Sequence, residues 1–168
     1  APSVLPVPAM PAAAPVSPEA PRRAPTAGPA DRLVAIGTST GGPRALQAVV
    51  PFLPADLPAG VLIVQHMPPK FTKSLADRLN ADSQIEVREA QPGDTVTTGV
   101  ALLAPGDYHM RVTADRRIEL TQDPPLWGVR PAVDVMLDSA VRLFERRMLA
   151  VVMTGMGRDG RDGCVQVR

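Results

Sequence analysis

Residues 33–50 read LVAIGTSTGGPRALQAVV, an apolar run followed by a glycine-rich turn and a helical pattern. The apolar run at 33–37 is short, as in a buried strand, and Pro43 suits the first turn of a helix. The apolar residues expected on one face of that helix are Leu46, Val49 and Val50. This stretch therefore predicts a strand, a tight turn and a helix in succession.

Strand and helix signals alternate along the rest of the chain. Residues 61–65 are apolar and β-branched, as in a strand buried on both faces, and Phe71, Leu75 and Leu79 recur every four residues and predict a helix. Short strands are expected at 85–88, 101–104 and 148–154, and an antiparallel hairpin at 110–113 and 117–120. The helix after Pro131 has apolar residues at helical spacing: Val133, Met136, Leu137, Ala140, Val141 and Phe144. The pattern predicts an α/β fold with a mostly parallel sheet flanked by helices and an antiparallel hairpin.

Proline divides the chain into two parts. Of the 20 prolines, nine fall in residues 1–30, and proline-rich sequence cannot form a helix interior or a paired strand. We therefore interpret residues 1–30 as a Pro/Ala-rich interdomain linker and residues 31–168 as one domain. Because the chain starts inside a linker and stops without a helix C-cap or a final apolar segment, we expect another domain upstream and missing C-terminal elements.

Composition excludes several classes of protein. No apolar run approaches the roughly 18 residues that a membrane span needs, so direct insertion into a membrane is not expected. A single cysteine, Cys164, cannot form an internal disulfide, which fits a reducing cytoplasm. Residues 31–168 carry no formal net charge, which argues against binding to nucleic acid.

A serine follows the first predicted strand in the pattern Gly-Thr-Ser-Thr-Gly, a G-x-S-x-G match at residues 37–41. Glycines on both sides allow a sharp turn that exposes the hydroxyl of Ser39 and leaves the N–H of Thr40 free to face a developing oxyanion. A glycine-rich turn without chemistry has the same pattern, so the motif alone leaves both interpretations open.

Histidine is the side chain that titrates in the range a serine nucleophile needs. His66 directly follows the strand at 61–65, so it is expected at the same sheet edge as Ser39. His109 follows Pro105-Gly106-Asp107 and starts a hairpin strand, which favours a structural or supporting role.

A carboxylate is needed to orient the histidine. Asp107, Asp134 and Asp159 are the candidates. Asp159 is favoured, because it alone lies in a glycine-rich loop leaving a buried strand. Asp134 falls in the first turn of a helix, where it complements the helix dipole, and Asp107 is most simply a turn residue.

Two other functions remain as alternatives. Residues 155–160 (GMGRDG) match G-x-G-x-x-G after a strand, the pattern of a dinucleotide-binding turn, although it normally follows the first strand of a domain. The other alternative is a non-enzymatic interaction module, in which the Pro/Ala-rich arm docks a partner.

The order serine, histidine, aspartate differs from the order in α/β-hydrolases. Instead, the chain closely resembles the catalytic domain of the chemotaxis protein-glutamate methylesterases from about residue 33 to residue 163. Five segments carry the resemblance: IGTSTGGP (36–43), QHMPPKF (65–71), LLAPGDYHM (102–110), RPAVDVML (130–137) and VVMTGMGRDG (151–160).

This resemblance implies a cytoplasmic serine hydrolase that needs no cofactor. It would demethylate glutamate methyl esters on the cytoplasmic helices of chemoreceptors and deamidate receptor glutamines. The residues that match the family's catalytic triad are Ser39, His66 and Asp159, and those matching its oxyanion-hole N–H groups are Thr40 and Met156. It also implies an N-terminal receiver domain, phosphorylated by the chemotaxis histidine kinase, that covers the active site when unphosphorylated.

Overall fold

A computed structural model of the chain describes residues 28–167. Its centre is a five-stranded, all-parallel sheet in the order β3-β4-β2-β1-β7. The strands are β1 (Leu33–Thr38), β2 (Gly60–Gln65), β3 (Glu86–Glu89), β4 (Val100–Leu103) and β7 (Met148–Val152). β1 lies between β2 and β7, so the chain runs to one side of β1 first and later returns to the other.

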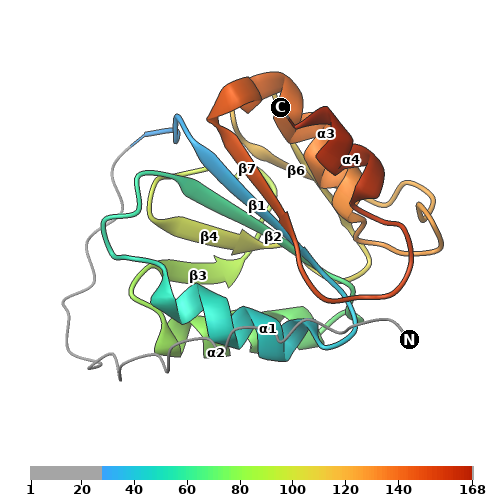
Figure 1. The fold of residues 1–168 in the computed structure, drawn as a ribbon, viewed down its shortest axis with the longest axis horizontal. Helices are drawn as coiled ribbons and strands as arrows, with labels where there is room; N and C mark the ends of the chain where they lie inside the picture. Colours follow the sequence, from blue (N-terminus) through green and yellow to red (C-terminus); the bar gives the residue numbers. More distant parts are fainter. Residues whose placement is uncertain (1–27, 168) are drawn as a thin grey trace, which may run out of the picture.

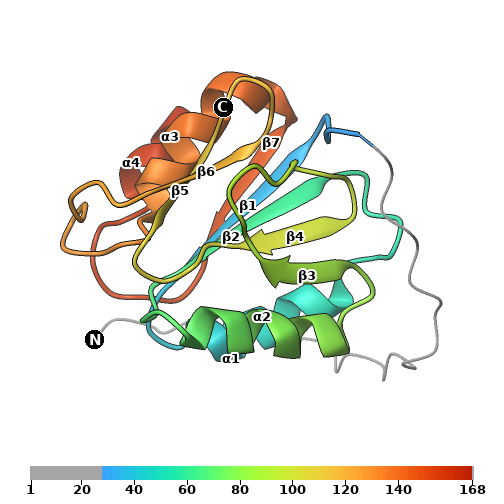
Figure 2. The ribbon, with the colours of Figure 1, turned by 180° about the vertical axis from the view of Figure 1, so that it is seen from behind.

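Helices cover both faces of this sheet (Figures 1 and 2). One face carries α1 (Gly42–Val49), the short 3-10 turn η1 (Val50–Phe52) and α2 (Phe71–Asp82). The other face carries α3 (Val133–Phe144), the 3-10 turn η2 (Glu145–Arg147), α4 (Arg161–Gln166) and an antiparallel hairpin of β5 (His109–Val112) and β6 (Ile118–Thr121). Apolar side chains fill the space on each side of the sheet. The larger cluster lies under α3 and the hairpin, and the smaller one under α1 and α2.

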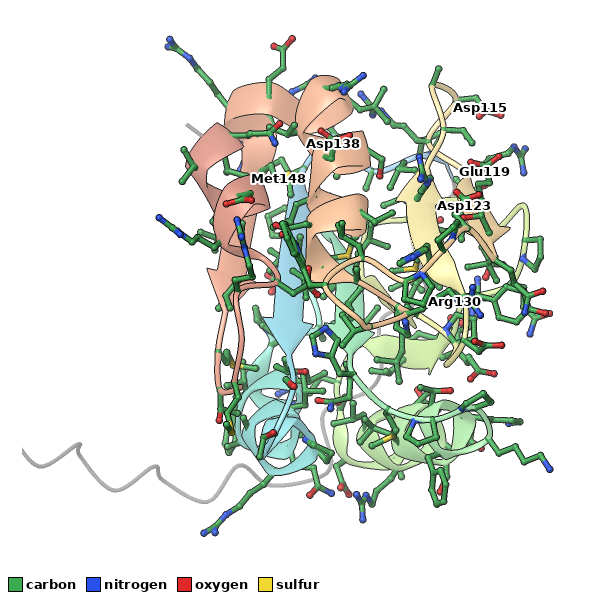
Figure 3. The ribbon with its side chains drawn as sticks, turned by 90° about the vertical axis from the view of Figure 1, so that its right-hand side faces the viewer. Asp115, Glu119, Asp123, Arg130, Asp138 and Met148 are labelled. Carbon is green, nitrogen blue, oxygen red and sulfur yellow. The ribbon has the colours of Figure 1, made fainter. Side chains whose placement is uncertain are left out.

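Acidic side chains follow the outer edge of the hairpin, where Figure 3 shows Asp115, Glu119 and Asp123. At the lower end of this row lies Arg130, whose guanidinium donates to the carbonyl oxygen of Asp123 at 2.9 Å and to the carboxylate of Asp107. Arg130 therefore ties the end of the hairpin to the segment that enters α3.

The predicted α/β architecture is confirmed, and so are the parallel strands and the antiparallel hairpin. One expected position on the first helix is wrong in detail. Val49 is 37% exposed, whereas Leu46 and Val50 are fully buried as expected, because the chain tightens into η1 directly after Val49. The helix predicted from Phe71, Leu75 and Leu79 is confirmed as α2, in which both leucines are buried and Phe71, the first residue, is 62% exposed.

The structure also adds features that the sequence pattern did not predict. α4 was not expected, and the last strand ends at Val152 rather than at residue 154. The fold reaches into the expected linker, since Ala30 is fully buried and its N–H donates to the carbonyl of Val96. The rest of that linker, residues 1–27, lies outside the described residues. In the part of the chain that is described, no helix has the length and hydropathy of a membrane span.

Candidate active site

Three neighbouring strands end at the same edge of the sheet. Ser39 directly follows β1, His66 directly follows β2, and the loop at residues 153–160 follows β7. Ser39, His66 and Asp159 line one cavity of about 180 Å³ at this edge. In open parallel sheets, ligand sites lie at the carboxyl ends of two neighbouring strands whose following connections go to opposite faces of the sheet. Here these two strands are β1 and β7.

Asp159 is the carboxylate that contacts His66. Nε2 of His66 donates to Oδ2 of Asp159 at 2.7 Å, and both side chains are mostly buried. The same carboxylate accepts the backbone N–H groups of Val133 at 2.6 Å and Asp134 at 2.9 Å. Because α3 begins at Val133 with no capping side chain of its own, Asp159 acts as its N-terminal cap from a distant loop.

These contacts set the charge state of Asp159. Burial by itself raises the pKa of the carboxyl, but the hydrogen bonds from His66, Asp134 and Val133 outweigh burial and hold the pKa below its usual range. The carboxylate is therefore charged at neutral pH, next to the helix end whose dipole favours a negative charge. A charged Asp159 can fix the ring of His66 and stabilise an imidazolium.

Ser39 is held by its backbone. Its N–H donates to the carbonyl of Thr154 at 2.9 Å, so the turn after β1 is joined to the loop after β7. Gly155 makes this approach possible, since a Cβ there would lie 2.8 Å from Cβ of Ser39. No hydrogen bond of the Ser39 hydroxyl occurs within residues 28–167. Such bonds are often long before a substrate binds.

The two expected oxyanion donors belong to the two loops that Ser39 joins. The hydroxyl of Thr154 donates to the carbonyl of Thr40 at 2.8 Å, which ties the donor Thr40 to the β7 loop. Met156 lines the cavity, with its side chain 84% exposed. Neither the N–H of Thr40 nor that of Met156 donates a hydrogen bond in the described part of the chain.

The other candidate aspartates have different partners. Asp134 accepts from the indole N–H of Trp127 at 3.0 Å and from the N–H of Gly163 at 2.8 Å, so it joins α3 to α4. Trp127 in turn lies under Arg158, 3.8 Å from the guanidinium carbon to the ring centroid. Asp107 is paired with Arg130. Among the three, Asp159 alone contacts His66.

His109 is buried away from the cavity. Its Nδ1 accepts the N–H of Ala132 at 3.2 Å, and its Nε2 donates to the carbonyl of Pro124 at 3.2 Å. Burial lowers the pKa of this ring, which keeps it neutral. These contacts agree with a structural or supporting role.

Gln65 is the site residue that the sequence reasoning missed. Its buried side-chain amide lies between the backbone of Ser39 and that of His66, and donates to both carbonyl oxygens. The available signal was a polar residue at the end of an otherwise apolar strand. No group of three or more possible metal ligands was found among residues 28–167.

Comparison with known proteins gives consistent matches. The family model described as CheB methylesterase matches residues 34–168. A protein-glutamate methylesterase/protein-glutamine glutaminase of Symbiobacterium thermophilum is 59% identical over 137 residues, covering 82% of this chain and 38% of the relative. One of the same name from Pyrococcus horikoshii is 52% identical over 143 residues, covering 83% of this chain and 39% of the relative.

A solved structure has the same architecture. The crystal structure of the Thermotoga maritima CheB methylesterase catalytic domain superimposes with a TM-score of 0.79 and 45% sequence identity, covering 81% of this chain and 74% of that one. The chain thus spans under half the length of the curated relatives described above.

Proposed function

The chain belongs to the CheB methylesterase family, and on that premise we propose that it is a serine hydrolase acting on glutamate methyl esters of chemoreceptor cytoplasmic helices. The observation that carries this proposal is the Asp159–His66 pair at 2.7 Å in the same cavity as Ser39. The relatives' names also include a glutaminase, which supports deamidation of receptor glutamines as a second reaction.

The first half of the reaction forms an acyl-enzyme. Oγ of Ser39 attacks the ester carbonyl carbon while His66 takes the hydroxyl proton. Because Nε2 of His66 is bonded to Asp159, Nδ1 is the nitrogen left for this proton. The N–H groups of Thr40 and Met156 stabilise the oxyanion. His66 then gives the proton to the methoxy oxygen, the C–O bond breaks, and methanol leaves.

The second half releases the product. A water molecule gives a proton to His66 and attacks the acyl carbon, and the Ser39 oxygen leaves with that proton. The free glutamate carboxylate is formed and the enzyme is restored. With a glutamine side chain the leaving group is ammonia instead of methanol. No cofactor takes part in these steps.

The proposed partners follow from the family. The substrate is the methylated cytoplasmic domain of a chemoreceptor, and the reaction takes place in the cytoplasm. A receiver domain, phosphorylated by the chemotaxis histidine kinase, is proposed to precede this domain in the full-length protein and to cover the site. The small share of each relative that this chain matches is consistent with that arrangement.

The test is release of methanol. Receptor membranes with labelled methyl esters are incubated with the chain and with Ser39→Ala, and volatile methanol is collected. We expect Ser39→Ala to lower the rate about 10³-fold or more, because the nucleophile is lost. The matched control is Ser74→Ala on the exposed face of α2, which should keep the rate. Equal methanol release from the wild type and Ser39→Ala would exclude the proposal.

A further inference from the structure

Gln65 links the two residues that the proposed reaction depends on. It is the last residue of β2, it is 2% exposed, and its register partner in β1 is Thr38. The next residue along each strand is a proposed catalytic one, His66 after Gln65 and Ser39 after Thr38. A side chain at this position can therefore act on the main chain of both.

The amide of Gln65 has hydrogen bonds on both of its ends. Nε2 donates to the carbonyl of Ser39 at 3.0 Å and to the carbonyl of His66 at 2.9 Å. Oε1 accepts from the hydroxyl of Thr38 at 2.7 Å. The orientation of the amide follows from these partners, because two carbonyl oxygens can only accept. A buried glutamate could not replace Gln65, because a carboxylate oxygen would then face the carbonyl oxygens of Ser39 and His66, and all of these groups only accept hydrogen bonds.

Gly42 leaves the space that the amide occupies. A Cβ at Gly42 would lie 1.7 Å from Oε1 of Gln65. The N–H of Gly42 also donates to the Ser39 carbonyl at 2.8 Å, so this carbonyl is held by two donors. The side chain of Gln65 on the neighbouring strand thus explains why residue 42 is a glycine.

We propose that Gln65 is a positioning residue, which holds the backbone of Ser39 and of His66 in the relative placement that proton transfer needs. It acts through these two residues, while its amide points into the protein between β1 and β2. The inference rests on the proposed function for its catalytic consequence. The positioning itself can be measured without substrate.

The first variant is Gln65→Met, which keeps the length of the side chain and removes all three hydrogen bonds. We expect kcat for methanol release to fall about 10²-fold, because small displacements of reacting groups have effects of this size. We expect KM to stay within about 2-fold, since no substrate contact is removed. The matched control, Gln91→Met, makes the same replacement at an exposed position and should leave both constants unchanged.

The second variant keeps Gln65 and displaces its amide. Gly42→Ala places a methyl group 1.7 Å from Oε1 of Gln65, so the amide must move, and 2.9 Å from Cβ of Thr38, so β1 must also shift slightly. The contact with Thr38 is the same whether or not Gln65 is present, so the comparison below isolates the contribution of the amide. We expect kcat to fall by about 10-fold or more. When Gln65 is already replaced by alanine, adding Gly42→Ala should lower kcat by no more than about a further 3-fold, because the amide that Gly42→Ala displaces is no longer there. If Gln65→Met is unfolded at the assay temperature, the effects of Gly42→Ala with and without Gln65→Ala decide whether Gln65 is a positioning residue.

The third measurement uses no substrate. In NMR spectra, the ring N–H of His66 that donates to Asp159 should give a slowly exchanging signal in the wild type and in Gln91→Met. Folded Gln65→Met should lose this protection. The proposal is overturned if that signal is unchanged, or if kcat of folded Gln65→Met stays within about 3-fold of wild type. If the wild type releases no more methanol than Ser39→Ala, the proposed function fails, and the NMR signal alone then decides the role of Gln65.

Discussion

The carboxylate of Asp159 serves a side chain and a helix at the same time. One oxygen accepts from both His66 and the N–H of Val133, and the other accepts the N–H of Asp134. Each of these donors favours the charged form of the carboxyl. The orientation of the proposed base and the start of α3 therefore depend on the same negative charge.

Replacing Asp159 should change stability in a pH-dependent way. The pKa of the folded carboxyl lies below that of the unfolded chain, about 3.9, so its contribution is full above that pH and is lost as pH falls through the folded pKa. Asp159→Asn should be less stable than wild type at neutral pH, by about 1–3 kcal/mol for weakened buried hydrogen bonds, and the gap should narrow below about pH 4.

Urea unfolding of both proteins over a pH series measures this gap. Asp82→Asn, at an exposed position of α2, is the control and should show little gap at any pH. A gap between wild type and Asp159→Asn that stays constant into the acid range would contradict a charge-dependent role for Asp159.

The start of α3 is held by distant residues. Asp159 accepts two of its N–H groups, and His109 accepts the N–H of Ala132, which immediately precedes the helix. An imidazole can accept a hydrogen bond only while it is neutral, so protonation of His109 would remove the bond to Ala132. The pKa of His109 is lowered, first by burial and then by the nearby charges of Arg130 and Arg111.

His109→Asn should therefore flatten the pH dependence of stability. The folded pKa of His109 lies below the unfolded value of about 6.5, so its contribution is full above that pH and decreases as pH falls towards the folded pKa. Wild type should lose stability from about pH 6.5 downwards, and the variant should lose less. Its stability at pH 8 should be lower by about 1–3 kcal/mol, because buried partners are left unpaired. Thermal unfolding across this pH range tests both expectations, and parallel curves would contradict them.

The elements that the sequence predicted well are those whose packing follows a simple period. α3 has apolar residues on one face over three turns, and Met136, Leu137 and Phe144 are all buried as that spacing predicts. α4 could not be predicted in the same way. It is six residues long, and it is held by tertiary contacts such as that between Gly163 and Asp134.

The candidate site was predictable where a residue follows a strand. The positions of Ser39 and His66 after apolar strands indicate a shared sheet edge, and the structure brings both to one cavity. The contact between Asp159 and His66 needed the strand order, which places β7 beside β1. Gln65 was missed because its role depends on the backbone of a neighbouring strand, which no pattern along the chain records.

For the whole molecule, both faces of the sheet must be covered for the site to form at its edge. The loops that meet there leave β1, β2 and β7. β1 and β2 carry buried side chains of the clusters on both faces, whereas β7 contributes Met148 and Ala150 to the larger cluster alone. Asp159 and His109 then connect the site to α3 and to the hairpin on one face. The geometry of the candidate site is thus a property of the assembled sheet and its covering layers.

The boundary between the expected linker and the domain can be tested by truncation. Ala30 is fully buried, its N–H donates to the carbonyl of Val96 at 2.7 Å, and its carbonyl accepts from Arg116 at 2.7 Å. Arg116 also pairs with Asp31 at 2.9 Å, although Asp31 is exposed and adds little.

A chain of residues 28–168 should therefore unfold with the same free energy as the full 168-residue chain. A chain of residues 33–168 should be less stable by about 2–4 kcal/mol, because it loses the buried side chain and two backbone hydrogen bonds of Ala30 and the Arg32 carbonyl that accepts the N–H of Gly60. Urea unfolding measures all three chains. The variant Ala30→Gly in the 28–168 chain separates the methyl group from the backbone bonds, and it should account for only part of the loss. If residues 28–168 alone were already less stable than the full chain, residues 1–27 would contribute to the fold, and their interpretation as a linker would be wrong.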